Sequence, residues 1–249
     1  MALVDAYFIC ATPRTGSTLL CELLRSTAVA GHPESYFRSG DVHLWATRFG
    51  VRDDPLDYET FLRAAMAAGR TRNGVFAARL MWGTFDDLLP LLGDLHPQTA
   101  TDDVRLLTKV FGRTRFVFLL REDVVAQAVS WTRAEQTQVW HPSDRDNPSD
   151  RDNLASEPRY DFAEIDSYVT TIRQHNAAWR EWFSTNDVEP HIVTYERLMP
   201  DGAEAVMEVL RFLGLSEQWD GRMSHDARRQ ADAINADWLD RYRRELRTT

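Results

Sequence analysis

The chain has 249 residues, of which 43% are hydrophobic and 27% charged, and its formal net charge is −9. We expect a single domain over residues 1–249, because this length and composition suit one buried core. The acidic balance argues against general binding to nucleic acids or anionic membranes. No apolar run reaches the roughly 20 residues that a membrane-spanning helix needs.

The cysteines and the first residues indicate a cytoplasmic protein. Residues 1–5 lack the basic start of a signal peptide. Cys10 and Cys21 fall in a predicted strand and a predicted helix, where small apolar side chains are usual, so we expect no disulfide. Lys109 is the only lysine. An anion site in this chain must therefore use arginine side chains or backbone N–H groups.

The first segment predicts a strand over 7–11, a short polar turn, and a helix over 19–24. The free N–H groups and the positive dipole end at the start of such a helix suit a phosphate or a sulfate. Arg14 adds a forked guanidinium to this turn, and Ser17 and Thr18 add hydroxyl groups. We expect the turn to hold the 5′ end of a nucleotide donor.

An ordinary turn is the alternative, with Gly16 present only for its backbone freedom. The turn is not a Walker A motif, because it lacks that motif's early glycine and its lysine.

Hydrophobic periodicity predicts the next elements in chain order. These are a loop running into a short extended segment at 31–37, helices over 41–49 and 58–70, a strand over 74–82, helices over 86–92 and 102–111, and the clearest central strand over 115–120. Arg121 stands at the end of that strand, and Asp123 caps a helix from Val124 to about Trp140.

The chain changes character over 141–160, where the sequence Ser-Asp-Arg-Asp-Asn occurs twice. Such a polar stretch predicts a surface loop. It is followed by a helix over 162–183, a strand over 191–195, a helix over 202–213, and a charged C-terminal region over 226–247. We expect this last region to be helical in part, with a break near Asn235.

The alternation of strands and helices predicts an α/β fold with a central, mainly parallel sheet flanked by helices. Ligands bind such sheets at the carboxyl ends of the strands, so residues 13–17 and Arg121 should line one cleft. Gln127 and Ser130 lie three apart on the following helix. They therefore share a face, and either can point back to this cleft.

Residues 13–18, Pro-Arg-Thr-Gly-Ser-Thr, resemble the P-K-[ST]-G-[ST]-T loop of sulfotransferases that use 3′-phosphoadenosine 5′-phosphosulfate (PAPS). Arg14 stands at the place of that family's lysine. Further stretches, in order along nearly the whole chain, are similar to the bacterial trehalose 2-sulfotransferase family. They are residues 14–20, 73–75, 80–82, 121–130, 179–183 and 229–232, with Trp238 and residues 241–243.

This resemblance implies a P-loop-like sulfotransferase fold, PAPS as donor and 3′-phosphoadenosine 5′-phosphate (PAP) as product. It implies that the loop residues hold the 5′-phosphate and the sulfuryl group; they are Arg14, Thr15, Gly16, Ser17 and Thr18. It implies that Arg121 and Ser130 take the 3′-phosphate, and that Arg229 and Gln230 close over the adenosine. The alternatives are a surface ion pair of Arg121 with Glu122 or Asp123, and a packing role for Ser130.

Sulfuryl transfer needs an acceptor oxygen in line, a base for its proton, and a cation for the leaving phosphate. Arg14 fits the last role, acting through charge and hydrogen bonds. The family's base is a glutamate in a G-x-P-x-E-[FY]-F segment, but here Ser35 takes its place and Glu34 lies one residue earlier. We predict Glu34 as the base and His32 as the second candidate. The chemistry requires no metal, and no metal-binding pattern stands out.

Arg79 stands where the family strand has lysine, and it either faces the donor or acceptor or pairs with a carboxylate. Three tryptophans either stack on a sugar or pack in the core; they are Trp45, Trp82 and Trp140. The leading hypothesis is transfer from PAPS to a hydroxyl of a carbohydrate or glycolipid precursor, with trehalose as the first acceptor to test. An ATP-dependent P-loop kinase and a catalytically silent nucleotide-binding protein of this fold are the alternatives. The resemblance also implies a homodimer.

Overall fold

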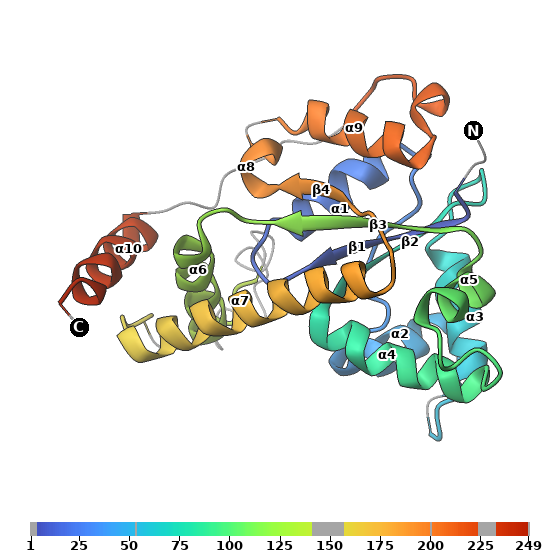
Figure 1. The fold of residues 1–249 in the computed structure, drawn as a ribbon, viewed down its shortest axis with the longest axis horizontal. Coiled ribbons are helices and arrows are strands. Elements are labelled where there is room, and N and C mark those ends of the chain that lie inside the picture. The colour runs from blue at the N-terminus through green and yellow to red at the C-terminus, as the bar shows by residue number, and fades with distance from the viewer. Residues whose placement is uncertain (1–3, 53, 141–156, 200, 224–232, 249) are drawn as a thin grey trace.

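Four parallel strands form the sheet, in the order β2-β1-β3-β4. The computed structural model describes residues 4–52, 54–140, 157–199, 201–223 and 233–248. The strands are β1 (Ala6–Ala11), β2 (Phe76–Met81), β3 (Thr114–Leu120) and β4 (His191–Thr194). With the helices that flank them, they confirm the predicted α/β class and its parallel sheet (Figure 1).

Helices occupy most of the remaining described chain. They are α1 (Ser17–Ser26), α2 (Val42–Phe49), α3 (Tyr58–Ala68), α4 (Trp82–Leu95), α5 (Asp103–Phe111), α6 (Val124–Thr137), α7 (Phe162–Thr185), α8 (Tyr195–Leu198), α9 (Ala203–Leu213) and α10 (Ala233–Leu246). Four begin after an aspartate whose side chain accepts a backbone N–H three residues on: Asp57, Asp102, Asp123 and Asp161. Such caps satisfy donors that the first helical turn leaves open.

Two helices differ clearly from the prediction in their bounds, whereas the other helices and strands predicted up to residue 213 differ by at most two residues at either end. Helix α4 starts at Trp82, earlier than the predicted residue 86, because no turn separates it from β2. Helix α6 ends at Thr137, because Gln138 takes a left-handed φ of 55°. Asn235, near which a break is predicted, lies inside α10 two residues after its start at Ala233, and its side chain accepts a hydrogen bond from Arg133 at 2.6 Å. Residues 226–232, the earlier part of the predicted region, lie outside the described chain.

Strand β1 is the centre of the sheet, and all six of its residues are buried. Its side chains alternate between two apolar clusters. Ala6, Phe8 and Cys10 face the cluster formed with α4, α5 and α7, whereas Tyr7, Ile9 and Ala11 face the cluster formed with α1 and α9. Figure 1 shows α9 and α1 on one side of the sheet and α4 and α7 on the other.

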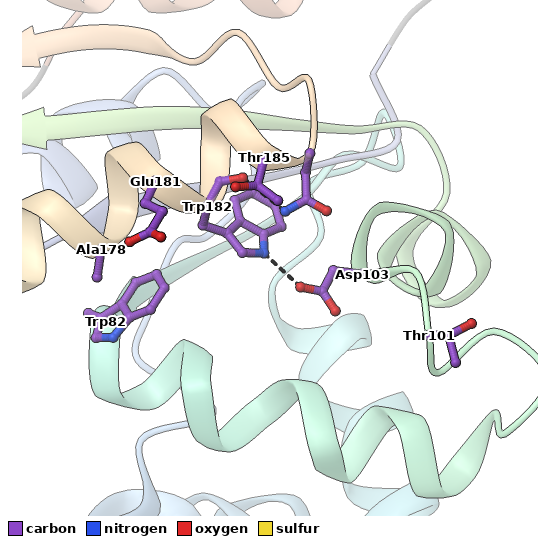
Figure 2. A pocket seen from close by; sticks show the side chains of 8 residues that line it. Trp82, Thr101, Asp103, Ala178, Glu181, Trp182 and Thr185 are labelled. Carbon is purple, nitrogen blue, oxygen red and sulfur yellow. Dashed lines mark hydrogen bonds between the residues drawn. The ribbon is translucent and has the colours of Figure 1, made fainter.

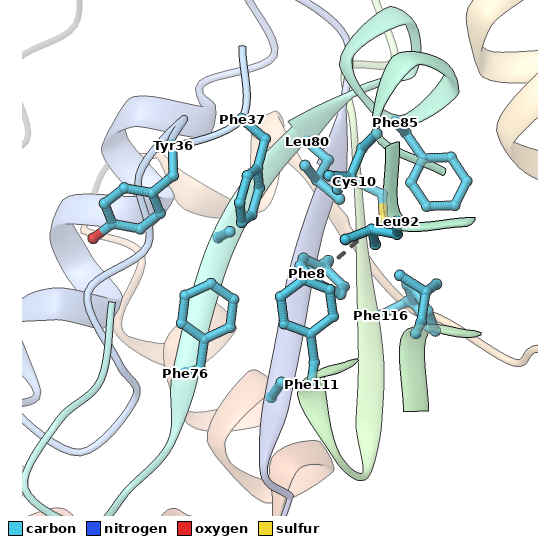
Figure 3. Close-up of a cluster of buried hydrophobic side chains, with 14 of the residues drawn as sticks. Phe8, Cys10, Tyr36, Phe37, Phe76, Leu80, Phe85, Leu92, Phe111 and Phe116 are labelled. Atoms are coloured by element: carbon cyan, nitrogen blue, oxygen red, sulfur yellow. Dashed lines mark hydrogen bonds between the residues drawn. The ribbon is translucent and has the colours of Figure 1, made fainter. Parts of the chain in front are cut away.

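Aromatic rings fill the cluster on the α4 and α7 side (Figure 3). The rings of Phe76 and Phe111 stack at 5.5 Å, and Phe8 meets Phe111 edge-on at 5.0 Å. On the same side, Trp179 is fully buried and its Nε1–H donates to the Ala11 carbonyl oxygen at 3.2 Å. This contact fixes the end of β1, from which the next loop departs.

Helix α10 packs against α6 and α7. The Tyr242 hydroxyl donates to Asp166 at 2.6 Å, and Arg243 donates to Asp123 at 2.9 Å. Since Asp123 also caps α6, the C-terminal helix holds the start of α6 in place.

Candidate active site

The loop that follows β1, residues 12–16, turns sharply into α1. Arg14 and Gly16 have left-handed φ angles of 65° and 82°. The Thr15 hydroxyl donates to the Thr12 carbonyl at 2.9 Å and closes the turn. Gly16 is the N-cap of α1 and supplies no side-chain cap. The first N–H groups of α1 therefore remain suited to an anion.

Gly16 is required here for two reasons. Its φ of 82° is unfavourable for other residues, and a Cβ at this position would lie 2.6 Å from Cδ2 of Tyr195. Tyr195, the residue after β4, therefore packs directly on the loop.

Helix α6 contacts the loop from the β3 side. The fully buried Gln127 donates through Nε2 to the Thr12 hydroxyl at 2.9 Å and to the Pro13 carbonyl at 2.6 Å. Ser130 accepts from Nε of Arg14 at 3.0 Å. Both side chains thus reach the loop, whereas their three-residue spacing predicts only that they share a face from which either can point to it.

Arg121, at the carboxyl end of β3, lies beside the same loop. Its Nη1 donates to the Arg14 carbonyl at 3.4 Å, and its guanidinium lies over the Tyr195 ring at 4.5 Å. Asp123, one of the two carboxylates considered as its partner, caps α6 and binds Arg243 instead. Arg121 is therefore held at the loop by an aromatic face and a backbone oxygen.

Arg79 approaches from the other side, along β2. Its Nε donates to the Ser35 hydroxyl at 2.9 Å, and its Nη1 donates to Thr18 at 2.9 Å and Ser17 at 3.3 Å. The guanidinium therefore lies at the first turn of α1. Arg14 within the loop, Arg79 on β2 and Arg121 after β3 therefore gather around the loop and the start of α1.

Residues 31–37 run against β2, and the predicted extended segment there forms no strand. Gly31 has a φ of 71°, and a Cβ would come within 2.7 Å of the Ala77 side chain. The Arg79 N–H donates to the Glu34 carbonyl at 2.9 Å. This backbone contact fixes the segment that carries the candidate bases.

The Glu34 side chain turns to Arg25 in the last turn of α1, and Oε1 forms an ion pair with its guanidinium. Oε2 makes no hydrogen bond among the described residues, and the side chain is 35% exposed. Ser35, one residue on, turns to Arg79 instead. Glu34 and Ser35, although adjacent, therefore point to different partners.

His32 and Cys21 lie near the same segment. Burial, together with the nearby charge of Arg25, lowers the pKa of His32 below its usual 6.5, so the imidazole is neutral at pH 7. Burial raises the pKa of Cys21 to about 12, so this thiol is not ionised at neutral pH. Both cysteines are free and buried. Of these two residues, only His32 can accept a proton near neutral pH.

A separate pocket of about 360 Å³ lies between α4, α5 and α7 (Figure 2). Trp82 and Glu181 line it, and Trp182 closes one side with its Nε1–H donating to Asp103 at 2.8 Å. Of the residues singled out from the sequence, Trp82 lines this pocket, whereas the residues predicted to bind the donor or act as the base do not. Trp82 also packs edge-on against Trp179 at 5.1 Å.

Some of the predicted features lie outside the described residues, namely Arg229, Gln230 and most of the polar loop at 141–160. Within the described part of the chain, no group of three or more His, Cys, Asp and Glu side chains could hold a metal ion. No helix in that part is both long and apolar enough to cross a membrane.

Tyr195 is the contact residue that sequence reasoning missed. The sequence pattern places Tyr195 as the last residue of a strand, but it begins α8 and contacts both Gly16 and Arg121. The rule that ligands gather at the carboxyl ends of parallel strands applies to β4 as well, and could have identified it.

Comparisons with known proteins identify the family of this chain. A family model described as Stf0 sulphotransferase matches residues 6–245. The trehalose 2-sulfotransferase of Mycolicibacterium smegmatis is 34% identical over 265 residues, which cover 96% of this chain and 95% of that protein. The trehalose 2-sulfotransferase of Mycobacterium tuberculosis is 33% identical, with 97% and 96% covered. Among solved structures, the sulfotransferase domain from the curacin biosynthetic pathway matches with a TM-score of 0.49 and 13% identity, covering 99% of this chain and 98% of that one.

The matched family defines the class of protein: this chain is a sulfotransferase. It belongs to the Stf0 sulphotransferase family.

Proposed function

We propose that this enzyme transfers a sulfuryl group from PAPS to a hydroxyl of a carbohydrate or glycolipid precursor, with trehalose as the first acceptor to test. The observation that carries the donor assignment is the gathering of Arg14, Arg79 and Arg121 at one loop before a helix start. Such an arrangement suits a polyanionic ligand. The names of the two relatives support trehalose.

The loop and the residues beside it on α6 and after β3 bind different parts of the donor. Arg14 and residues 15–18 hold the 5′-phosphate and the sulfuryl group, using guanidinium, hydroxyl and N–H donors. Arg121 and Ser130 take the 3′-phosphate, and Gln127 keeps the loop in shape through Thr12 and Pro13. The closing of Arg229 and Gln230 over the adenosine stays a prediction.

PAPS supplies the activated sulfur. The acceptor oxygen attacks this sulfur while the bond between sulfur and the 5′-phosphate oxygen breaks, and PAP leaves with the additional negative charge. Arg14 stabilises that charge without giving up a proton, because a guanidinium stays protonated. The proton of the acceptor hydroxyl passes to a base of the enzyme.

We assign Glu34 as this base and keep His32 as the second candidate. The free Oε2 of Glu34 supports the first assignment, since Arg25 binds only Oε1. The lowered pKa of His32 supports the second, because its neutral imidazole can accept a proton at pH 7. If the protein is instead catalytically silent, neither side chain acts as a base and no acceptor is sulfated.

Two measurements test the proposal. In the first, the thermal unfolding of the protein is compared with PAPS, PAP and ATP–Mg²⁺. We expect PAPS and PAP to raise the melting temperature; a rise with ATP–Mg²⁺ but not with PAP would favour a kinase and overturn the proposal. In the second, sulfate transfer from PAPS is followed by mass spectrometry over a panel of trehalose, glucose and other sugars. Binding of PAP with no transfer to any acceptor would favour the silent alternative.

We also propose that the enzyme works as a cytoplasmic homodimer. The composition and the two free cysteines support a reducing compartment, and the resemblance noted in the sequence supports the dimer. Light scattering after gel filtration gives the oligomeric state directly, and a monomer at micromolar concentration would contradict the second half of this proposal.

A further inference from the structure

Arg79 is a charged residue in an otherwise apolar stretch of β2. Phe76, Ala77, Ala78 and Leu80 are buried, and Arg79 between them is half-buried. By alternation it shares a face with Ala77, which packs in the cluster formed with α1 and α9. Removing a guanidinium from water in this way is costly unless its charge is compensated.

The partners of Arg79 in the described protein do not compensate that charge. Its three side-chain hydrogen bonds all go to neutral hydroxyl groups, those of Ser17, Thr18 and Ser35. No ion pair among the described residues includes Arg79. Nη2 makes no hydrogen bond within that part of the chain. The guanidinium therefore keeps a full positive charge and an open donor edge.

The surroundings of this charge add to the need for an anion. Ser17 and Thr18 are the first two residues of α1, where the helix dipole is positive and Gly16 provides no side-chain cap. Without a ligand, a cation beside a positive helix end is electrostatically unfavourable. An anion at this point would be attracted by both the Arg79 guanidinium and the positive end of α1.

The order of the strands in the sheet indicates which end of the donor Arg79 faces. Strand β1 lies between β2 and β3, so Arg79 and Arg121 flank the loop from opposite sides. Arg121 contacts the Arg14 carbonyl, and Ser130 lies on the helix that follows β3. If these groups take the 3′-phosphate, Arg79 is placed at the 5′ end, with Ser17 and Thr18.

We propose that Arg79 is a binding residue for the 5′-phosphosulfate end of the donor. This inference rests on the proposed function and adds a residue to it. The same side chain is bonded to Ser35, and its backbone N–H holds Glu34, so the group that takes the donor's reactive end also anchors the segment carrying the candidate bases. Arg79 thereby links the donor to the side from which the acceptor approaches.

The test compares two ligands that differ only in the 5′-phosphate, PAP and adenosine 3′-monophosphate. Affinities are measured by calorimetry for the wild type, Arg79→Gln and Arg79→Lys. A hydrogen-bonded charge contributes enough that we expect Arg79→Gln to weaken PAP binding by about 10- to 100-fold, with the affinity for adenosine 3′-monophosphate unchanged. Arg79→Lys keeps the charge without the fork, and we expect a smaller loss confined to PAP.

Arg63→Gln is the matched control, because Arg63 lies on the exposed surface of α3. It should leave both affinities unchanged. Equal losses for the two ligands in Arg79→Gln, or no loss for either, would overturn the inference. If the wild type itself binds neither PAP nor PAPS, it is the proposed function that fails.

Protein without ligand provides a second readout. A purely structural Arg79 would lower the melting temperature of Arg79→Gln while PAP affinity was retained, and this result would also overturn the inference. A charge held ready for an anion predicts the reverse: a melting temperature without ligand that is equal to or above that of the wild type, and a smaller increase on adding PAP.

Discussion

Replacing Gly16 by alanine tests the packing of the loop against Tyr195. The φ of 82° alone should cost about 1–2 kcal/mol for a residue with a Cβ. The added Cβ would lie 2.6 Å from Cδ2 of Tyr195, a contact that forces the ring or the loop to move. Overpacking of this kind typically costs about 1–3 kcal/mol. We expect a total loss of about 2–5 kcal/mol in the free energy of unfolding.

Gly214→Ala separates the two contributions. Gly214 has a φ of 73° at the C-cap of α9, and nothing lies within 4 Å of a Cβ built there. It should therefore show only the backbone cost, about 1–2 kcal/mol. Urea unfolding of both variants measures the difference, which we attribute to the clash with Tyr195.

Tyr195→Ala, made alone and in the Gly16→Ala background, completes a double-mutant cycle. Since the smaller side chain makes room for the Cβ, the second alanine should cost about 1–3 kcal/mol less in a chain that already lacks the ring. A Gly16→Ala variant that is no more destabilising than Gly214→Ala, or an absence of coupling between residues 16 and 195, would contradict the predicted clash. Calorimetry with PAP on the same proteins shows whether the displaced loop still binds the donor.

Three further predictions follow from single contacts. Glu34→Gln should lower kcat by about 10²- to 10⁴-fold and leave PAP affinity intact, because it removes the proton acceptor and its ion pair with Arg25 but no group assigned to the donor; near-normal turnover would rule out Glu34 as the base. Hydrogen bonds from Arg113 hold the pKa of Asp5 at about 2, below its usual 3.8. Asp5→Asn should therefore destabilise the protein above pH 4 in urea unfolding, with the difference from wild type fading as the pH falls towards 2; a constant difference would contradict this. Trp179→Phe leaves the Ala11 carbonyl without its donor and should lower the free energy of unfolding by about 1–3 kcal/mol, and a change near zero in urea unfolding would contradict it.

The regular elements could be predicted because their patterns are local. Strand β1 is a continuous apolar run, as expected for a strand that is buried on both faces, and the cap at Asp123 gives the start of α6 to the residue. The anion site at the loop could also be predicted, since a strand, a short polar turn and a helix follow one another directly in the sequence. Asn235 makes a contact that local patterns do not reveal: it accepts a hydrogen bond from Arg133, about a hundred residues earlier, which links α10 to α6.

The site side chains could be predicted only in part, because their directions depend on contacts far along the chain. Arg79 could equally have paired with a carboxylate, and only the pairing of β2 with β1 brings it to the first turn of α1. Glu34 and Ser35 are neighbours in sequence, yet no local pattern reveals that Arg25 binds one and Arg79 the other.

The central position of β1 has a consequence for synthesis on the ribosome. Its first residue, Ala6, pairs with Phe76 on one side and Thr114 on the other. At the usual rate of about 5–20 residues per second, the first partner strand begins to emerge about 4–14 s after β1, and the second about 5–22 s after it. During this interval a fully apolar strand has neither neighbour, so the nascent chain is a natural client for chaperones that shield hydrophobic segments.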